Sequence, residues 1–253
     1  MTIEEVAQHV LQLARSGKIE EAHQTYNEAL VAVPRRPVLV ELLHKLPLIF
    51  DENFYADSRV RSLQSAELLL GLLAPHLVAR NAVDFGAGIG TWLDAACLAG
   101  AESALGIEGH WVEKSQLRFA GAVFRYQDLN NTIELERRFD LAISVEVAEH
   151  VQPTGGPTFV DDVCRASDQV LFGAALPRQP GDGHINCRPH SYWAAEFQRN
   201  GYTGLDPFRA HAWYDTRVEP WYAQNCFLFV KEGRPLTSNF PPAVLQLSTS
   251  CLT

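Results

Sequence analysis

The sequence predicts an α/β protein, in which a mainly parallel sheet of the nucleotide-binding type carries a helical extension at its N-terminus. In segment 81–92, an apolar run is followed by three closely spaced glycines and then by an apolar-periodic stretch. A strand, a glycine turn and a helix in this order are typical of the first crossover of such a sheet. Further short apolar runs at 104–107, 122–126, 141–145 and 169–175 supply the next strands.

The glycine turn has a spacing that points to one class of ligand. Glycine lets the backbone turn sharply and lie close to a ligand, because it has no Cβ. A dinucleotide-binding fingerprint needs its third glycine at position 91, whereas this chain has Thr91 there and its third glycine is Gly90. Asp84 stands two residues before Gly86, which gives the pattern acidic-x-Gly-x-Gly-x-Gly. A tight turn that binds no ligand is the alternative interpretation.

Acidic residues stand where the next strands end. Glu108 lies twenty positions beyond Gly88, at the end of the second apolar run. In nucleotide-binding sheets an acidic residue at this distance binds the ribose diol, and an ionised carboxylate can accept from both hydroxyls. Asp128 follows the third run, and Glu146 follows the fourth.

Together these motifs resemble those of the class I S-adenosylmethionine-dependent methyltransferases. The segment Phe-Asp-Leu-x-x-Ser-x-Glu-Val-x-Glu-His, which ends at His150, is similar to the fourth motif of small-molecule enzymes that include the ubiquinone-pathway O-methyltransferases. The resemblance implies a Rossmann-like sheet of seven strands in the order 3-2-1-4-5-7-6, with S-adenosylmethionine as the cofactor. In this family the acid after the third strand reaches the adenine amino group. The residues implied to bind the cofactor are Asp84, Phe85, Gly86, Ala87, Gly88, Glu108, Gly109, Asp128, Leu129 and Glu146.

The segment 176–189, rich in proline and glycine, is expected to be an ordered loop beside the site, because it follows the carboxyl end of a strand. Methyl transfer requires alignment of the acceptor and removal of its proton, which a histidine of near-neutral pKa can accept. We expect His184 to be this base, with His150 as the second choice. For each histidine the alternative is a hydrogen bond that only holds loop backbone. The residues expected to bind the acceptor are Tyr55, Glu149, Asn186, Tyr192 and Trp193.

The same loop also suggests a metal site. His184, Cys187 and His190 offer imidazole and thiolate ligands at intervals of three. These intervals are not a recognised zinc arrangement and Pro189 stiffens the segment, so we expect no metal there. Glu149 has two interpretations as well, since it is either a substrate-facing acid or a helix-start residue favoured by the helix dipole.

The chain is expected to divide into a helical hairpin at 1–50, a methyltransferase domain at 51–231 and a tail at 232–253. The hairpin looks like a single tetratricopeptide-type unit, which cannot bury its apolar face alone. We therefore expect it to cap the domain or to form a homodimer contact, with docking to a scaffold as the alternative.

Within the domain, a helix at 62–77 is expected to lead into the sheet, and further helices are expected at 158–167 and 191–200. Two final strands are expected at 205–214 and 222–231. The resemblance implies that these last two strands form an antiparallel pair at the edge of the sheet.

Composition limits the classes of partner. Of 253 residues, 47% are hydrophobic and 20% charged, and the net charge of −9 argues against binding to nucleic acid. Five cysteines, an odd number without a framework spacing, suit reduced thiols. No segment has the length of a membrane span, and acidic residues rather than a signal sequence follow Met1. We expect a cytoplasmic protein that does not contact membranes.

The sequence thus predicts methylation of a small molecule, at a hydroxyl of a natural-product or sugar-like acceptor. The alternatives are an N- or C-methyltransferase of a small metabolite, and an inactive cofactor-binding module that acts through its N-terminal helices. A nicotinamide-dependent oxidoreductase is disfavoured, because the chain lacks both the glycine at position 91 and a Tyr-x-x-x-Lys motif.

Overall fold

The computed structural model describes residues 52–77, 79–109, 122–179, 181, 183–234 and 240–243, together with scattered residues between 5 and 25. From 52 to 59 it describes the backbone alone. The predicted hairpin at 1–50 and most of the predicted tail therefore lie outside the described residues, as does the side chain of Tyr55.

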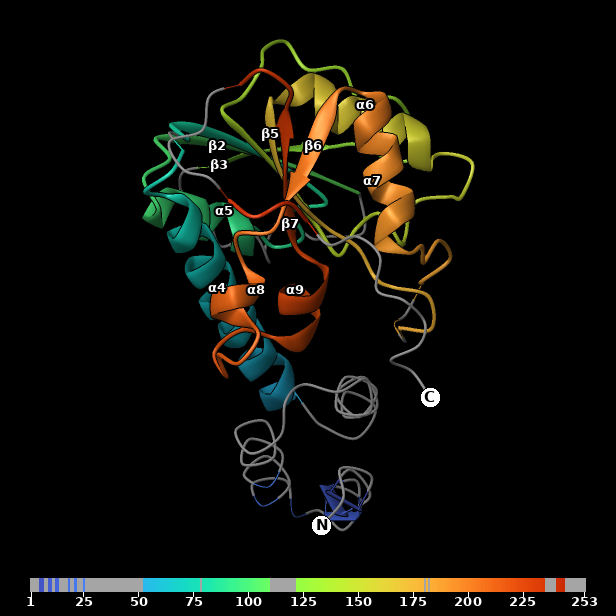
Figure 1. Ribbon diagram of the computed structural model, residues 1–253. Coiled ribbons are helices and arrows are strands. Elements are labelled where there is room, and N and C mark those ends of the chain that lie inside the picture. Colours follow the sequence, from blue (N-terminus) through green and yellow to red (C-terminus); the bar gives the residue numbers. More distant parts are fainter. Residues whose placement is uncertain are drawn as a thin grey trace.

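A single sheet of seven strands organises the domain, in the order β3-β2-β1-β4-β5-β7-β6, so the predicted order is confirmed (Figure 1). The first five strands pair in parallel, whereas β7 is antiparallel to both β5 and β6. The strands are β1 Asn81–Phe85, β2 Ser103–Glu108, β3 Ala122–Tyr126, β4 Leu141–Val145, β5 Gln169–Gly173, β6 Tyr202–Leu205 and β7 Phe227–Lys231.

Helices cover both faces of the sheet, which is why the central strands are buried on both faces and mainly apolar rather than alternating. Every residue of β4 and β5 is buried. Figure 1 shows α6 and α7 on one side of the sheet, and α4 and α5 on the other. The helices are α4 Glu52–Leu73, α5 Thr91–Leu98, α6 Gly156–Ala166, α7 His190–Arg199, α8 Arg209–Ala212 and α9 Pro220–Asn225. None of the described helices is both long and apolar enough to cross a bilayer.

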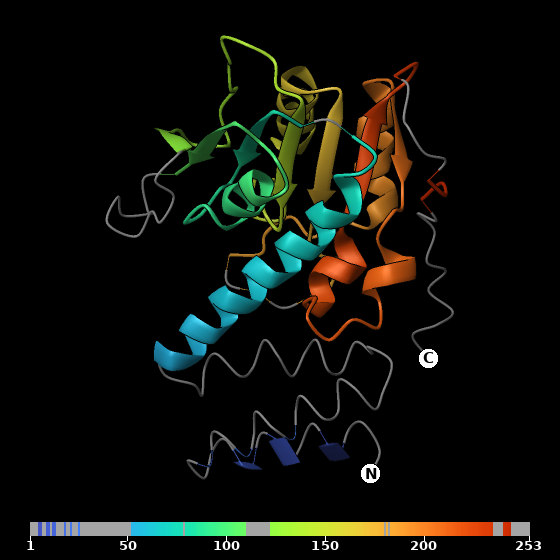
Figure 2. The same cartoon turned by 90° about the vertical axis from the view of Figure 1, so that its left-hand side faces the viewer.

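Alternate residues of the strands pack into two separate cores. Val83 and Phe85 point toward α6 and α7, where they join Phe159 and Phe197. Ala82 and neighbouring β4 residues point the other way, toward α4, α5, α8 and α9. Figure 2 shows the short helices α8 and α9 lying beside the long helix α4.

The predicted strand at 205–214 is wrong, because β6 ends at Leu205 and α8 follows it. Pro207 has no N–H to donate to a sheet. The Asp206 Oδ1 atom accepts hydrogen bonds from the backbone amides of Phe208, at 3.2 Å, and Arg209, at 3.1 Å, so the chain turns into the helix.

Other boundaries also differ from those expected. The expected strand at 222–231 starts only at Phe227, because Pro220 occupies the first turn of α9, where its missing N–H costs nothing. The helix expected at 62–77 runs from Glu52 to Leu73 instead, and a turn that contains Pro75 follows it. The helices expected at 158–167 and 191–200 are present to within two residues at each end.

The carboxyl ends of the five parallel strands meet at one edge of the sheet, and the start of β7 reaches the same edge because β7 runs the other way. The loops after β1, β2, β3, β4 and β5 therefore converge there, together with the last residue of α9. This convergence positions the candidate site.

Candidate active site

The glycine turn after β1 has the left-handed backbone that its sequence requires. The φ angles are 82° at Gly86, 53° at Gly88 and 97° at Gly90. A Cβ added at Gly86 would overlap the Val147 side chain, whereas one added at Gly88 would meet no atom within 4 Å. The turn is thus packed on one side and leaves space for a ligand beside Gly88.

Glu108 is attached directly to this turn. Its side chain is 5% exposed, and its Oε2 atom accepts a hydrogen bond of 2.6 Å from the Gly88 amide. The Oε1 atom accepts a second bond of 2.6 Å from the Gly109 amide. Because each carboxylate oxygen has two acceptor positions, Glu108 can hold the turn and still accept from a ribose.

The residues around the turn differ in what they offer to a cofactor. Asp84 is buried, and its Oδ2 atom has no hydrogen-bond partner in the described part of the chain. Burial, with the charge of Glu108 adding to it, raises the pKa of Asp84 well above its ordinary value. Phe85 lies edge-on to Phe159 at 6.1 Å and Ala87 packs in a small apolar cluster, so only their backbone atoms can reach a cofactor.

Asp128 lies beyond the end of β3 with its carboxylate exposed. The Oδ1 atom accepts hydrogen bonds of 2.9 Å from both the backbone amide and the side-chain amide of Asn130, and these bonds lower the pKa of Asp128. Asn130 Oδ1 in turn accepts from the Gln152 amide at 2.8 Å, which joins this loop to the loop after β4. Leu129 is buried, so its backbone rather than its side chain is available to a ligand.

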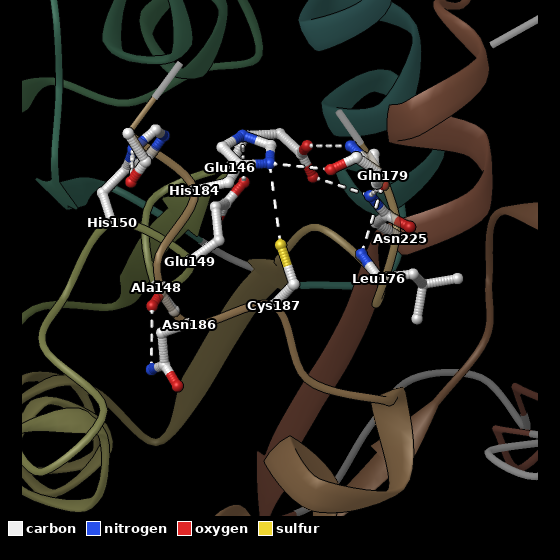
Figure 3. A network of polar contacts seen from close by, with 11 residues as sticks. Glu146, Ala148, Glu149, His150, Leu176, Gln179, His184, Asn186, Cys187 and Asn225 are labelled. Atoms are coloured by element: carbon white, nitrogen blue, oxygen red, sulfur yellow. Dashed lines mark hydrogen bonds and ion pairs between the residues drawn. The ribbon is translucent and has the colours of Figure 1, made fainter. Parts of the chain in front are cut away.

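Glu146, directly after β4, is held by two amide side chains that the sequence did not indicate. Its φ angle is 56°, which is rare for a residue other than glycine. The Oε2 atom accepts from Gln179 Nε2 at 2.8 Å, and the Oε1 atom accepts from Asn225 Nδ2 at 2.9 Å (Figure 3). Asn225 Nδ2 also donates to Gln179 Oε1 at 3.0 Å. Three segments distant in sequence are therefore closed into one network.

Glu149 is the most unusual carboxylate of the site. Its exposed fraction is 0%, and neither carboxylate oxygen has a hydrogen bond of ordinary geometry to any described residue. Burial, followed by the charge of Glu146, raises the pKa of Glu149 to about 9. Its backbone carbonyl accepts from the amides of Ile185 and Asn186, both at 2.9 Å, and so fastens the loop 176–189 to the end of β4.

The two predicted histidines lie together beside Glu149 (Figure 3). Their ring centroids are 5.0 Å apart, and His184 Nε2 is 3.9 Å from Glu149 Oε1. His184 Nδ1 lies 3.1 Å from the Gln179 carbonyl, and His150 Nδ1 lies 3.2 Å from the Gly183 carbonyl. A carbonyl can only accept, so both contacts assign the ring proton to Nδ1.

The three possible metal ligands considered from the sequence, His184, Cys187 and His190, do not come together in the structure. His184 Nδ1 does lie 3.7 Å from Cys187 Sγ, but the ring of His190 is buried edge-on to Phe227 at 4.9 Å. The group whose ligand atoms come together in the described chain is instead Glu149, His150 and His184.

The residues expected to bind the acceptor are placed differently from one another. Asn186 is buried, with its Nδ2 donating to the Ala148 carbonyl at 3.3 Å and its Oδ1 accepting from Arg188 Nε at 2.9 Å, so it holds the loop. The Arg188 guanidinium carbon lies 5.2 Å from the centre of the Tyr192 ring. Trp193 is 1% exposed and packs 5.6 Å from Phe172, which places it in the core rather than at an acceptor surface. Trp193 was expected to bind the acceptor, but α7 turns its side chain toward the sheet.

No protein-family profile and no curated protein sequence match this chain. Among solved structures, the sugar N-methyltransferase KedS8 from Streptoalloteichus sp ATCC 53650 has a TM-score of 0.55 at 12% identity, over 72% of this chain and 93% of that chain. CalS10, an amino pentose methyltransferase from Micromonospora echinaspora, has a TM-score of 0.53 at 13% identity, over 72% and 98%. An S-adenosylmethionine-dependent methyltransferase from Clostridium acetobutylicum ATCC 824 has a TM-score of 0.51 at 10% identity, over 76% and 99%.

The chain has the class I methyltransferase fold. In this methyltransferase fold the glycine turn follows β1 and Glu108 ends β2, as the motif resemblance implied. Gln179 and Asn225 are the site residues that sequence reasoning missed. Nothing in the local sequence indicated them, because Asn225 was expected inside a strand and Gln179 is one polar residue in a loop of many.

Proposed function

We propose that this protein is an S-adenosylmethionine-dependent methyltransferase of a small-molecule acceptor, with a hydroxyl oxygen as the atom methylated. The observation that carries the cofactor assignment is the 2.6 Å hydrogen bond between Glu108 and the Gly88 amide. It joins a buried carboxylate, suited to a ribose diol, to a glycine turn with open space beside it. The methyltransferase fold supports the same assignment.

The remaining cofactor contacts follow from the placement of the predicted residues. The Asp84 Oδ2 atom, which has no hydrogen-bond partner among the described residues, would gain a favourable partner from a positively charged group of the cofactor, because a buried polar atom without a partner is costly. Asp128, exposed beyond β3, is available to the adenine amino group. The exposed backbone of the turn is available to the rest of the cofactor.

The acceptor would lie beyond β4, where Glu149, His150 and His184 meet. When bound, the cofactor supplies the methyl group, and the acceptor oxygen forms its new bond to carbon as the carbon–sulfur bond breaks. His184, whose Nε2 atom lies 3.9 Å from Glu149 Oε1, would take the acceptor proton. His150 is the second candidate for this role.

A sugar-like or other cyclic acceptor is supported by two of the structural neighbours, which are described as a sugar N-methyltransferase and an amino pentose methyltransferase. The same descriptions favour N-methylation of an amino sugar as the second candidate function. Paired sugar nucleotides that differ only in a hydroxyl or an amino group, offered with methyl-labelled cofactor, would separate the two.

The cofactor assignment is tested by calorimetric titration of S-adenosylhomocysteine into the full chain. Replacement of Glu108 by alanine removes both the ribose acceptor and the bond to Gly88, so we expect affinity at least tenfold weaker, corresponding to about 1.4 kcal/mol or more. The matched control is Glu102→Ala, which removes an exposed carboxylate at the start of the same strand region.

Absence of binding heat in the unaltered protein would refute the cofactor assignment. Binding without label transfer to any hydroxyl or amino acceptor would instead favour the inactive cofactor-binding module. The homodimer expected through residues 1–50 stays a prediction, which light scattering on the full chain would test.

A further inference from the structure

We propose that Glu149, His150 and His184 bind a divalent transition-metal ion of the zinc class, on the acceptor side of the site. One ligand atom from each of these three side chains lies within 4.8 Å of the other two. The binding of the ion is inferred from these residues alone. Only its consequence for the acceptor rests on the proposed methyltransferase function.

The first argument is the state of the Glu149 carboxylate. It is completely buried, and neither oxygen has a hydrogen-bond partner of ordinary geometry among the described residues. Buried carboxyl groups are normally hydrogen-bonded, paired with a cation or bound to a metal, since a buried polar group without a partner is unfavourable. The His184 ring faces one of these oxygens, so a cation between them would supply the missing partner.

The second argument is the orientation of the two imidazole rings. Each directs Nδ1 at a loop carbonyl, that of Gln179 for His184 and that of Gly183 for His150. A histidine that ligates a metal usually donates its other ring N–H to a carbonyl or carboxylate, which fixes the tautomer and the ring plane. With the proton on Nδ1, the Nε2 atom of each ring carries the lone pair that an imidazole ligand uses.

The distances require a small closure around the ion. Bonds of about 2.0–2.2 Å to nitrogen and oxygen place neighbouring ligand atoms about 3–3.5 Å apart. The observed separations, 3.9 Å for His184 and Glu149 and up to 4.8 Å in the group, are about 1 Å larger. His150 is exposed and His184 lies in the irregular loop, so both rings can shift by this amount. Gly181, which packs against the His184 ring, has no side chain to obstruct such a shift.

The ligand types indicate which ion is bound. Two imidazoles with one carboxylate form a set used by catalytic zinc and by other first-row transition metals, whereas Mg²⁺ prefers oxygen ligands. Glu146 already accepts from Gln179 and Asn225, so we do not count it as a ligand.

Three protein ligands leave at least one coordination position for an acceptor oxygen. An ion at this position would lower the pKa of the acceptor hydroxyl, whose proton would pass to solvent. The oxygen would then bond to the methyl carbon, and the electron pair of the broken carbon–sulfur bond would remain on sulfur. With the ion bound, His184 acts as a ligand, and the base role given to it above is taken over by the ion.

The test is titration of Zn²⁺ into the full chain by calorimetry, with the visible absorption of added Co²⁺ as a second readout. The key variant is His150→Ala, because this side chain is exposed and its removal leaves the core intact. We expect zinc affinity at least tenfold weaker in His150→Ala, Glu149→Gln and His184→Ala, with loss of the Co²⁺ bands. The control His211→Ala removes an exposed histidine on α8 and is expected to bind both ions unchanged.

Zinc binding that is absent from the unaltered protein, or equally strong in His150→Ala and in the unaltered protein, would overturn the proposal, as would tighter binding of Mg²⁺ than of Zn²⁺. Circular dichroism identifies any variant that fails to fold. If Glu149→Gln or His184→Ala is unfolded, the result for His150→Ala decides the test.

Titration of S-adenosylhomocysteine into the same unaltered protein separates the two proposals. An unaltered protein that binds S-adenosylhomocysteine but not Zn²⁺ refutes the metal site alone, and one that binds Zn²⁺ but not S-adenosylhomocysteine refutes the proposed function alone.

Discussion

Glu108 and Glu149 are both buried carboxylates at the same edge of the sheet, yet their surroundings differ. Glu108 accepts two backbone hydrogen bonds of 2.6 Å, from the amides of Gly88 and Gly109. Glu149 has no equivalent bonds to described residues, and its pKa is raised to about 9. The proposals above accordingly assign different ligands to the two sites: the ribose hydroxyls of the cofactor at Glu108, and the metal ion held with His150 and His184 at Glu149.

His190 provides a prediction at the scale of a single residue. It is 6% exposed, and burial, with the charge of Arg209 adding to it, lowers its pKa to about 4, against the opposing effects of Asn225 and Asp206. The unfolded chain binds a proton below a pKa of about 6.5, whereas the folded protein does not until about pH 4. This residue therefore makes the free energy of unfolding fall as pH drops through that window, by up to about 3 kcal/mol.

Urea denaturation at a series of pH values would check this prediction, with His190→Gln as the comparison. The variant is expected to lose the part of the pH dependence that lies between about 6.5 and 4. His211→Gln, on the exposed surface of α8, should retain it. An identical pH dependence in all three proteins would contradict the assignment.

At the scale of elements, polar side chains hold loops and helix ends against the sheet. Asp162 Oδ2, in α6, accepts from the Ile133 amide at 2.7 Å, and Ser65 Oγ, in α4, accepts from the Glu219 amide at 2.9 Å. The loop 176–189 is fastened at Glu149 and through Gln179. The strands fix the position of the sheet edge at which the site lies, and these hydrogen bonds determine the path of the loops that follow the strands.

Tyr202 gives a prediction at this scale. Its hydroxyl, at the start of β6, lies 2.7 Å from the Cys164 carbonyl and 2.6 Å from the Ser167 carbonyl, so it ties the edge strand to the end of α6. In Tyr202→Phe the hydrogen bond is lost and the carbonyls stay buried, so we expect a loss of about 1–2 kcal/mol in the free energy of unfolding. Tyr214→Phe is the control, because that ring is exposed. Equal stabilities of the two variants would refute the tether.

For the whole molecule, cofactor binding and folding are expected to be linked. The proposed cofactor site collects residues from four strand ends, and these residues come together only in the folded chain. S-adenosylhomocysteine at one hundred times its dissociation constant should then stabilise the protein by about 2.7 kcal/mol. Thermal unfolding should show a midpoint that rises with its concentration, with a smaller rise in Glu108→Ala and an unchanged rise in Glu102→Ala. A midpoint independent of concentration would contradict this linkage.

The sequence by itself determined the positions of the five parallel strands, the glycine turn and Glu108, because local signals carry each of them, whereas the order of the strands in the sheet followed from the resemblance of the motifs. Apolar runs mark buried strands, three glycines mark a left-handed turn, and an acid at a strand end keeps its place relative to that turn through the parallel register. The predicted strand at 205–214 does not form, although this segment has an apolar pattern. Asp206 and Pro207 carry the opposite local signal, because they end the strand and start α8.

Only the tertiary structure decided which side chains meet on the acceptor side. The network of Glu146, Gln179 and Asn225 joins the ends of β4, β5 and α9, and the pairing of His184 with Glu149 depends on the path of an irregular loop. The orientation of Trp193 into the core depends likewise on how α7 packs. These contacts join residues distant in sequence, and no local pattern encodes the distance between them.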